Sequence, residues 1–129
     1  MERVVITGLG TVNPLGNNKN IFWDNLSNGV NGVSRISLFD TEKFKVKIAA
    51  ESKINLSNYF NSKELNKLDR FAAFSIIAAD EAIIDSKLKN YDSNRIGVII
   101  GSGIGGIQSL ENQHKKLLNN LAPDSSKTL

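Results

Sequence analysis

The chain has 129 residues, of which 40% are hydrophobic and 22% charged, and a formal net charge of +3. This length suits one domain with a core and is too short for two ordinary domains. Cysteine is absent and His114 is the single histidine, which excludes disulfides, thiolate metal sites and a cysteine nucleophile, so we expect no metal site.

The slight excess of basic residues does not predict a nucleic-acid-binding protein. Lys and Arg number 16 against 13 Asp and Glu, and the aromatic residues do not alternate with basic ones as they do on platforms for single-stranded nucleic acid. No apolar run approaches the ~20 residues of a membrane span. A strand pattern begins within a few residues of Met1, so we predict no signal segment and a cytoplasmic protein.

In chain order, the first predicted element is a strand over residues 3–7, which are rich in β-branched side chains. It ends on the glycine turn at residues 8–10. Asn17 and Asn18 are good N-caps for the helix that follows, and Gly29 stands where the C-terminal cap of that helix belongs.

Four more elements follow. Residues 45–49 alternate polar and apolar side chains, which predicts a half-exposed strand. Residues 63–87 form the longest helical pattern and are apolar nearly all round, which places this helix inside a multilayer fold. Residues 95–100 predict a buried strand, and residues 107–118 predict a final amphipathic helix.

The order β-α-β-α-β-α predicts an α/β fold with a mainly parallel sheet and flanking helices. Parallel sheets need both faces covered and rarely stop at three strands. The chain therefore looks incomplete at its C-terminal end, and its helices should leave apolar faces uncovered.

The most informative segment is the glycine loop, residues 101–106, which follows the strand pattern of residues 95–100. Its spacing of Gly101, Gly103 and Gly106 matches the dinucleotide-binding fingerprint. That fingerprint belongs to the first strand of its unit and needs an acidic residue about 20 positions on, at the end of another strand. Asp124 stands at that distance but in a segment without periodicity, so nucleotide binding stays an alternative.

Two other catalytic interpretations of the glycine loop fit less well. A phosphate-binding P-loop is excluded, because no Gly-Lys-Ser/Thr follows the glycines. Ser102 lacks the Gly-x-Ser-x-Gly elbow of a serine nucleophile and has only His114 as a candidate base. We expect Ser102 to be a small residue in a tight loop.

Six short segments together resemble a known family in both order and spacing. They are residues 5–10, 14–16, 23–29, 39–40, 67–71 and 95–106. The family is that of the β-ketoacyl-acyl-carrier-protein synthases, and Ile104 resembles the type II branch. The resemblance implies the N-terminal half of a thiolase-like fold, usually a homodimer, with a partial synthase domain at residues 1–120 and an irregular tail at 121–129.

The resemblance also implies an activity and its partner. The family performs a decarboxylating Claisen condensation of acyl and malonyl groups held on acyl carrier protein. A cysteine carries the acyl chain as a thioester, and two histidines and a lysine assist decarboxylation and stabilise the developing charge. None of these residues lies in this chain, which covers about the first third of a family chain. We therefore expect a truncated, partial or frameshifted product that has no catalytic residue, needs no cofactor and is inactive alone.

Five residues match family positions that bind substrate or partner. Ile104 matches the position that lines the far end of the acyl pocket near the dimer interface, and Gly103 and Gly105 would let the backbone pass that pocket closely. Lys63 and Lys67 match basic positions that face the acidic carrier protein. From the residues alone, Ile104 is equally an ordinary core side chain, and the two lysines are a solvated helix end.

Two matching positions carry no such function. Asn66 replaces a basic residue at a third docking position, which weakens the expected contact with the carrier. His114 matches a position on a helix and not a catalytic histidine. Besides the synthase and nucleotide-binding interpretations, a third stays open, in which the chain is a non-catalytic remnant that binds a partner synthase or carrier protein.

Overall fold

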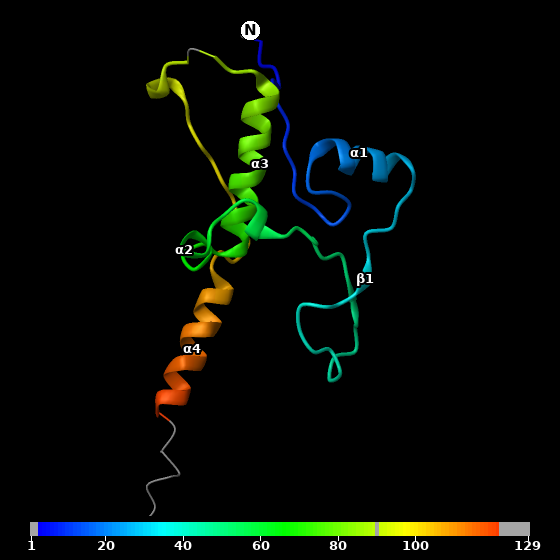
Figure 1. The fold of residues 1–129 in the computed structure, drawn as a ribbon, viewed down its shortest axis with the longest axis vertical. Helices are drawn as coiled ribbons and strands as arrows, with labels where there is room; N and C mark the ends of the chain where they lie inside the picture. Colours follow the sequence, from blue (N-terminus) through cyan, green and yellow to red (C-terminus); the bar gives the residue numbers. More distant parts are fainter. Residues whose placement is uncertain (1–2, 90, 122–129) are drawn as a thin grey trace, which may run out of the picture.

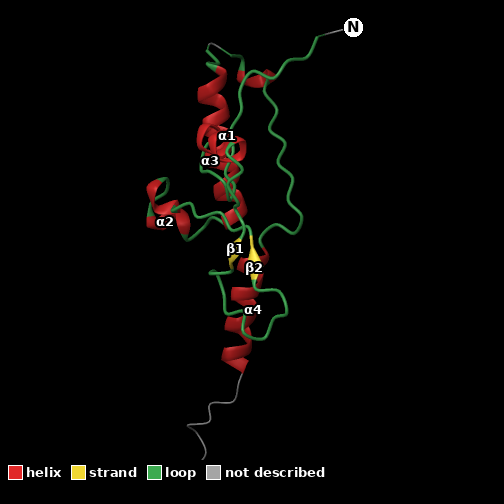
Figure 2. Ribbon diagram, turned by 90° about the vertical axis from the view of Figure 1, so that its right-hand side faces the viewer, coloured by secondary structure: helices red, strands yellow, loops and turns green. Residues whose placement is uncertain are grey.

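A computed structural model of the chain describes residues 3–89 and 91–121 (Figure 1). In chain order the elements are α1 (Lys19–Ser27), β1 (Ser34–Arg35), β2 (Ile48–Ala49), the 3₁₀ turn η1 (Leu56–Asn58), α2 (Ser62–Leu65), α3 (Arg70–Ser86), the 3₁₀ turn η2 (Ser93–Arg95) and α4 (Ile107–Leu121). The longest helix, α3, stands at the centre, with α4 extending from one end of it and the β1–β2 hairpin set to one side (Figures 1 and 2).

The single helix predicted over residues 63–87 is divided in two, which corrects the sequence interpretation. α2 ends at Leu65 with Asn66 as its C-cap, and Asp69 adopts extended backbone at φ −69° and ψ 151° before α3 begins. Asp69 thus occupies the N-cap position, where this residue type is favoured. At the other end, Lys87 adopts a left-handed conformation with φ 52°, and its N–H donates to the carbonyl of Ile84, which ends α3.

The predicted caps of α1 are confirmed. Of the two candidates, Asn18 is the N-cap, and its side chain accepts a hydrogen bond of 2.9 Å from the N–H of Ile21. Gly29 follows the helix with φ +66°, and the N–H of Val30 reaches back to the carbonyl of Asn25 at 2.9 Å. This pair of features is the Schellman ending of a helix, which glycine permits because it has no Cβ.

The glycine turn at residues 8–10 lies directly against α3, as the N-terminal segment in Figure 1 shows. A Cβ added at Gly8 would overlap the carbonyl oxygen of Ala82, and one added at Gly10 would overlap that of Ala78. These glycines therefore bring two backbones together, which explains the Gly-x-Gly spacing by packing within the chain.

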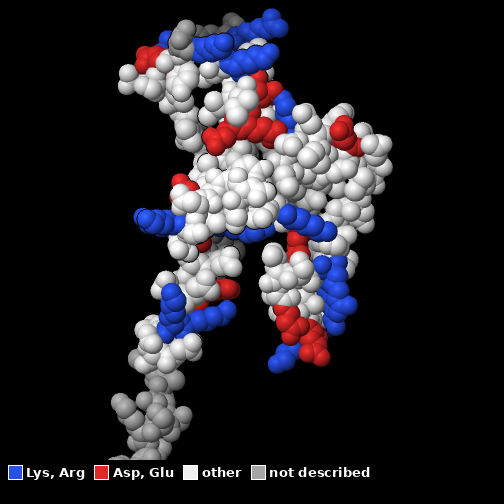
Figure 3. Space-filling model, viewed as in Figure 1, with Lys and Arg blue, Asp and Glu red and all other residues white. Residues whose placement is uncertain are grey.

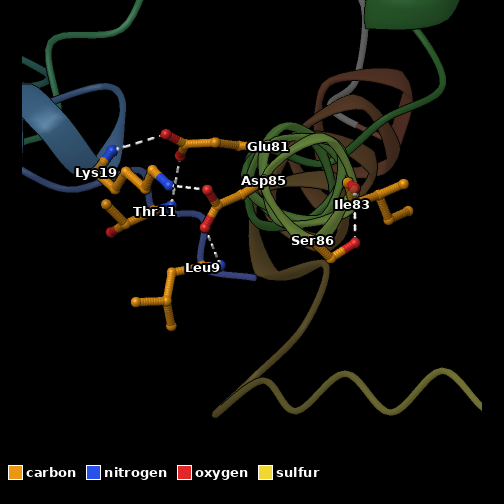
Figure 4. A network of polar contacts seen from close by, with 7 residues as sticks. All are labelled: Leu9, Thr11, Lys19, Glu81, Ile83, Asp85 and Ser86. Atoms are coloured by element: carbon orange, nitrogen blue, oxygen red, sulfur yellow. Dashed lines mark hydrogen bonds and ion pairs between the residues drawn. The ribbon is translucent and has the colours of Figure 1, made fainter. Parts of the chain in front are cut away.

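Two carboxylates one helical turn apart on α3 hold this N-terminal segment in place (Figure 4). Glu81 accepts the N–H of Thr11 on Oε2 at 2.9 Å and the N–H of Lys19 on Oε1 at 2.8 Å. Asp85 accepts the N–H of Leu9 on Oδ2 at 3.0 Å, and its other oxygen pairs with the ammonium of Lys19. We call Glu81 and Asp85 the α3 carboxylate pair. Because i and i+4 share a helix face, both carboxylates reach the same segment.

The described residues form one sheet, which has two short antiparallel strands (Figure 2). Ser34 pairs with Ala49 and Arg35 pairs with Ile48. The strand predicted over residues 45–49 is therefore confirmed only at its last two residues. The mainly parallel sheet predicted from the element order is not found among the described residues.

The two other predicted strands, residues 3–7 and 95–100, have no sheet partner among the described residues. Their apolar side chains are exposed, with Ile6 at 82% and Ile99 at 99%. Figure 2 shows the segment between η2 and α4 standing away from the helices. A strand forms only when a neighbouring strand accepts and donates its backbone hydrogen bonds, and residues 3–89 and 91–121 supply no such neighbour here.

The buried core is small and centres on α3. Only Ile54, Ala73 and Ile77 are buried apolar residues within the described part of the chain. On the same helix Ile83 is 55% exposed and Ile84 is 77% exposed, so the expectation of uncovered apolar faces is confirmed. The helices in the described ranges are all too short or too polar to cross a membrane.

We predict that Gly10→Ala lowers the free energy of unfolding by more than about 2 kcal/mol, because its Cβ would overlap the backbone of α3. Gly97→Ala is the matched control. A Cβ at Gly97 meets nothing within 4 Å, so the change should stay within about 1 kcal/mol. Denaturant unfolding followed by circular dichroism measures both variants. Equal effects would contradict the close packing of Gly10 on α3.

A second prediction concerns pH. The side chain of Lys19 and the N–H of Leu9 hold the pKa of Asp85 below its ordinary value of 3.8, with further help from the charge of Lys87. The charge of Glu81 also lies close by, since both carboxylates bind Lys19. A folded-state pKa that is lowered contributes stability above the ordinary pKa, and this contribution disappears as the pH falls through the lowered value.

The thermal unfolding midpoint should therefore fall on acidification below about pH 4, and it should fall less in Asp85→Asn than in the parent chain. Asp80→Asn is the control, because Asp80 is exposed on the same helix and makes no hydrogen bond or ion pair within the described residues. Thermal scans over a pH series test this. Parallel curves for the parent and Asp85→Asn would rule out the role given to Asp85.

Candidate functional site

The glycine loop at residues 101–106 joins the exposed segment 95–100 to α4. Gly105 has φ +73°, and its N–H donates to the Ser102 hydroxyl oxygen at 3.0 Å. Ser102 therefore closes the turn that leads into α4, in agreement with its expected place in a tight loop. The N–H of Ile107 also bonds the carbonyl of Gly105 at 2.9 Å.

The three residues predicted to bind substrate lie together at the exposed side of this loop. Ile104 is 77% exposed. A Cβ added at Gly103 or Gly105 meets nothing within 4 Å, although the positive φ of Gly105 itself favours glycine. The described residues thus bring Gly103, Ile104 and Gly105 together without a facing wall, and their role in an acyl pocket stays a prediction.

The last glycine of the loop has one close neighbour, Asp69 at the start of α3. A Cβ added at Gly106 would lie 2.5 Å from Asp69 Oδ2. The other carboxylate oxygen, Oδ1, accepts a hydrogen bond of 2.7 Å from the hydroxyl of Ser109 on α4. We call Asp69, Gly106 and Ser109 the Asp69 joint, because they connect the start of α3 to the start of α4.

The two predicted docking lysines lie on and just after α2. Asn61 and Glu64 form a capping box, in which Asn61 Oδ1 accepts the N–H of Lys63 at 2.9 Å. The N–H of Lys67 then donates to the carbonyl of Glu64 at 2.9 Å, so the chain turns tightly between the two lysines. Both side chains are exposed, and Figure 3 shows basic side chains projecting outward at the level of α2.

A polar cavity of about 410 Å³ lies between the α2–α3 turn and α4. Its lining includes Asn66, the residue that replaces a basic position of the family, together with Asp69 and Ser109 of the joint. The charge of Arg70, which also lines it, is engaged elsewhere: Nη2 donates to the carbonyl of Ser52 at 2.6 Å, and the guanidinium lies 4.8 Å from the ring centroid of Phe74.

The described residues offer no metal centre or catalytic cluster. Within residues 3–89 and 91–121, no group of three or more His, Cys, Asp or Glu side chains could hold a metal ion. His114 lies exposed on α4. Asp124, the acidic candidate of the dinucleotide alternative, lies outside the described residues. Of the irregular tail predicted over residues 121–129, Leu121 belongs to α4, and residues 122–129 lie outside the described residues.

The roles of Asp69 and of the α3 carboxylate pair in organising the structure were not predicted from the sequence. Asp69 lies in a segment that resembles the family, but no role was predicted for it. Its signal was the position of an Asp directly before a long apolar helical run, which is typical of an N-cap. Glu81 and Asp85 carried a second signal, as two acids spaced i and i+4 on an otherwise apolar helix.

The comparison with protein families covers nearly the whole chain. The model of the family described as "Beta-ketoacyl synthase, N-terminal domain" matches residues 1–127. The chain belongs to the β-ketoacyl synthase family. This membership favours the ketosynthase interpretation of the glycine loop over the dinucleotide alternative.

Two curated relatives bear the same name, 3-oxoacyl-[acyl-carrier-protein] synthase 2. The protein from Staphylococcus aureus is 44% identical to this ketosynthase chain over 121 residues. The one from Synechocystis sp. is 38% identical over 121 residues. In both cases the match covers 92% of this chain and 29% of the relative. The chain thus spans less than a third of the length of these relatives.

Among solved structures, "The ishigamide ketosynthase/chain length factor" resembles this ketosynthase chain with a TM-score of 0.73 and 22% sequence identity. The likeness covers 93% of this chain and 30% of that one. It shows that the described elements are arranged as in a ketosynthase fold, which is thiolase-like.

Proposed function

We propose that this chain supplies the N-terminal part of a type II 3-oxoacyl-[acyl-carrier-protein] synthase of fatty-acid biosynthesis. The observation that carries the proposal is the 44% identity to a curated synthase 2, which extends over 92% of the chain. The family match over residues 1–127 supports it independently. The activity belongs to the complete enzyme, because the chain has no cysteine.

The chemistry of the complete enzyme defines what this part leaves to other residues. The acyl group moves from its carrier to a cysteine thiolate. Loss of CO₂ from the malonyl group then leaves an enolate, whose carbon attacks the cysteine-bound carbonyl. A carbon–carbon bond forms and the thiolate leaves. The nucleophile and the two histidines of this scheme lie outside the chain, and so does the assisting lysine.

The contribution of this chain to the reaction is a wall of the acyl pocket, with Ile104 at its far end and Gly103 and Gly105 on either side. The exposure of these three residues supports this role. Ile104 exposes 77% of its surface, and the two glycines face open space. An acyl chain would gain stabilisation by removing that apolar surface from water.

The second contribution of this chain is a docking surface for acyl carrier protein, formed by Lys63 and Lys67. Both lysines are exposed, and neither forms an ion pair within the described residues. Two such cations at one turn suit an acidic partner, and charge pairing of this kind raises the association rate and fixes the orientation of the partner. The contact should weaken as salt rises.

Three further features belong to the complete enzyme in this proposal. Residues 3–7 and 95–100 would become strands of a mainly parallel sheet once neighbouring strands are present. Their exposed apolar side chains support this, with Val98 at 79% and Ile99 at 99%. The complete enzyme would form a homodimer, as its family usually does, and act in the cytoplasm.

The chain alone should not catalyse condensation. Purified chain incubated with acyl and malonyl carrier proteins should release no CO₂ and form no 3-oxoacyl product, because it lacks a nucleophile. Malonyl-dependent condensation by the purified chain would overturn the expectation that it is inactive alone. So would an acyl label on the chain that a thioester-cleaving reagent removes.

Charge reversal tests the docking surface. We expect Lys63→Glu combined with Lys67→Glu to raise the Kd for acyl carrier protein by about tenfold at low salt, through loss of charge complementarity. Lys43→Glu combined with Lys45→Glu is the control, because these exposed lysines between β1 and β2 give the same change in net charge. Fluorescence anisotropy of labelled carrier protein measures the Kd. Equal weakening by both pairs would show non-specific attraction and contradict a docking surface at α2.

A further inference from the structure

The side chain of Asp69 does not do what its position in the helix predicts. An Asp at an N-cap ordinarily accepts hydrogen bonds from the first backbone N–H groups of its own helix. Asp69 has the extended backbone of an N-cap but makes no such side-chain bond to α3. Its carboxylate instead accepts a hydrogen bond from the hydroxyl of Ser109, which lies 40 residues away on α4.

This bond is the only fixed polar connection of α4 to the earlier chain within the described residues. The other hydrogen bonds at the start of α4 are local, such as those from Ile107 to Gly105 and from Leu110 to Gly106. No ion pair links α4 to another element in the described ranges. The neighbouring Arg70 does not compete for Asp69, since it bonds Ser52 and covers Phe74.

The same carboxylate also leaves no room for a side chain at the last residue of the glycine loop. Asp69 Oδ2 lies so close to Gly106 that a Cβ there would come within 2.5 Å of it. Oδ1 bonds Ser109 in the first turn of α4, and Oδ2 fills the space that a side chain at Gly106, the last residue of the loop, would need. The loop that carries Ile104 is therefore anchored at its C-terminal side by one residue of the α2–α3 turn.

Lys63 and Lys67 lie at the α2 side of the α2–α3 turn. The N–H groups of Lys67 and Leu68 both donate to the carbonyl of Glu64, at 2.9 Å and 3.1 Å. These bonds fix the chain from α2 to within one residue of Asp69. The turn between α2 and Asp69 is therefore closed by backbone hydrogen bonds.

We propose that Asp69 is a positioning residue that couples the lysine-bearing α2 segment to the glycine loop, through its contacts with Ser109 and Gly106. The geometry of the joint stands on its own. The functional meaning of its two ends, carrier docking and the acyl-pocket wall, rests on the proposed function. Binding of a carrier protein at α2 then changes how firmly the loop is held.

Hydrogen exchange on the full 129-residue chain tests the joint without any ligand. In Ser109→Ala, exchange of the amides at residues 101–110 should accelerate about fivefold or more, because the start of α4 loses its hydrogen bond to Asp69. Ser109→Thr keeps the hydroxyl and should restore the parent rate. Exchange in the middle of α3 should not change in either variant.

Asp69→Ala and Gly106→Ala should accelerate the same amides, and adding Ser109→Ala to Asp69→Ala should cause no further acceleration. Asp80→Ala is the control on α3. Asp69→Ala also changes the residue at the N-cap position of α3. Ser109→Ala avoids that difficulty and decides the outcome. Unchanged exchange at residues 101–110 in Ser109→Ala, or equal acceleration in α3, overturns the joint.

Addition of acyl carrier protein then tests the coupling. In the parent chain, the carrier should change exchange at residues 101–110 as well as at residues 62–68. In Ser109→Ala the carrier should still bind at α2 and change only residues 62–68, and its Kd should shift by the factor that the lost coupling represents. A loop response that survives in Ser109→Ala overturns the coupling. Absence of carrier binding by the parent chain refutes the docking surface instead, and the ligand-free measurement still decides the joint.

Discussion

The position of residues 9–19 depends on two carboxylates of α3. Glu81 and Asp85 hold three backbone N–H groups and one ammonium of the N-terminal segment, at Leu9, Thr11 and Lys19. The glycines of the turn make this possible, because their lack of Cβ atoms lets the segment reach the backbone of α3. Where few apolar side chains are buried, such bonds to charged groups carry a larger share of the tertiary order.

α3 is thus joined by polar contacts to another part of the chain at each of its ends. Its C-terminal half binds the N-terminal segment, and its N-cap binds the start of α4 through Ser109. Between the two ends, only Ala73 and Ile77 are buried on this helix, while its outer isoleucines remain exposed. The described part of the chain is therefore held by polar contacts and buries few apolar side chains. This is expected, because the chain spans 29% of the length of its relatives.

The sequence was sufficient for features that depend on near neighbours. The N-cap of α1 was narrowed to Asn17 or Asn18 and its C-terminal end was placed at Gly29, because caps are local chemistry. The strands at residues 3–7 and 95–100 could not be judged in this way, since a strand exists only with its partner. The break before Asp69 was missed because apolar residues continue on both sides of it. The side-chain contacts of Asp69 and Glu81 could not be predicted at all, since periodicity gives no information on which distant groups meet.

The unpaired segment at residues 95–100 also has a consequence for how such a chain behaves in solution. Val98, Ile99 and Ile100 are uncharged, contain no proline and expose 79%, 99% and 56% of their surface. A short run of this kind is the sequence signature of intermolecular strand pairing. Any chain in which it stays uncovered can pair there with another chain. In the proposed complete enzyme the same side chains would enter a sheet, so the segment would favour aggregation only before that sheet forms.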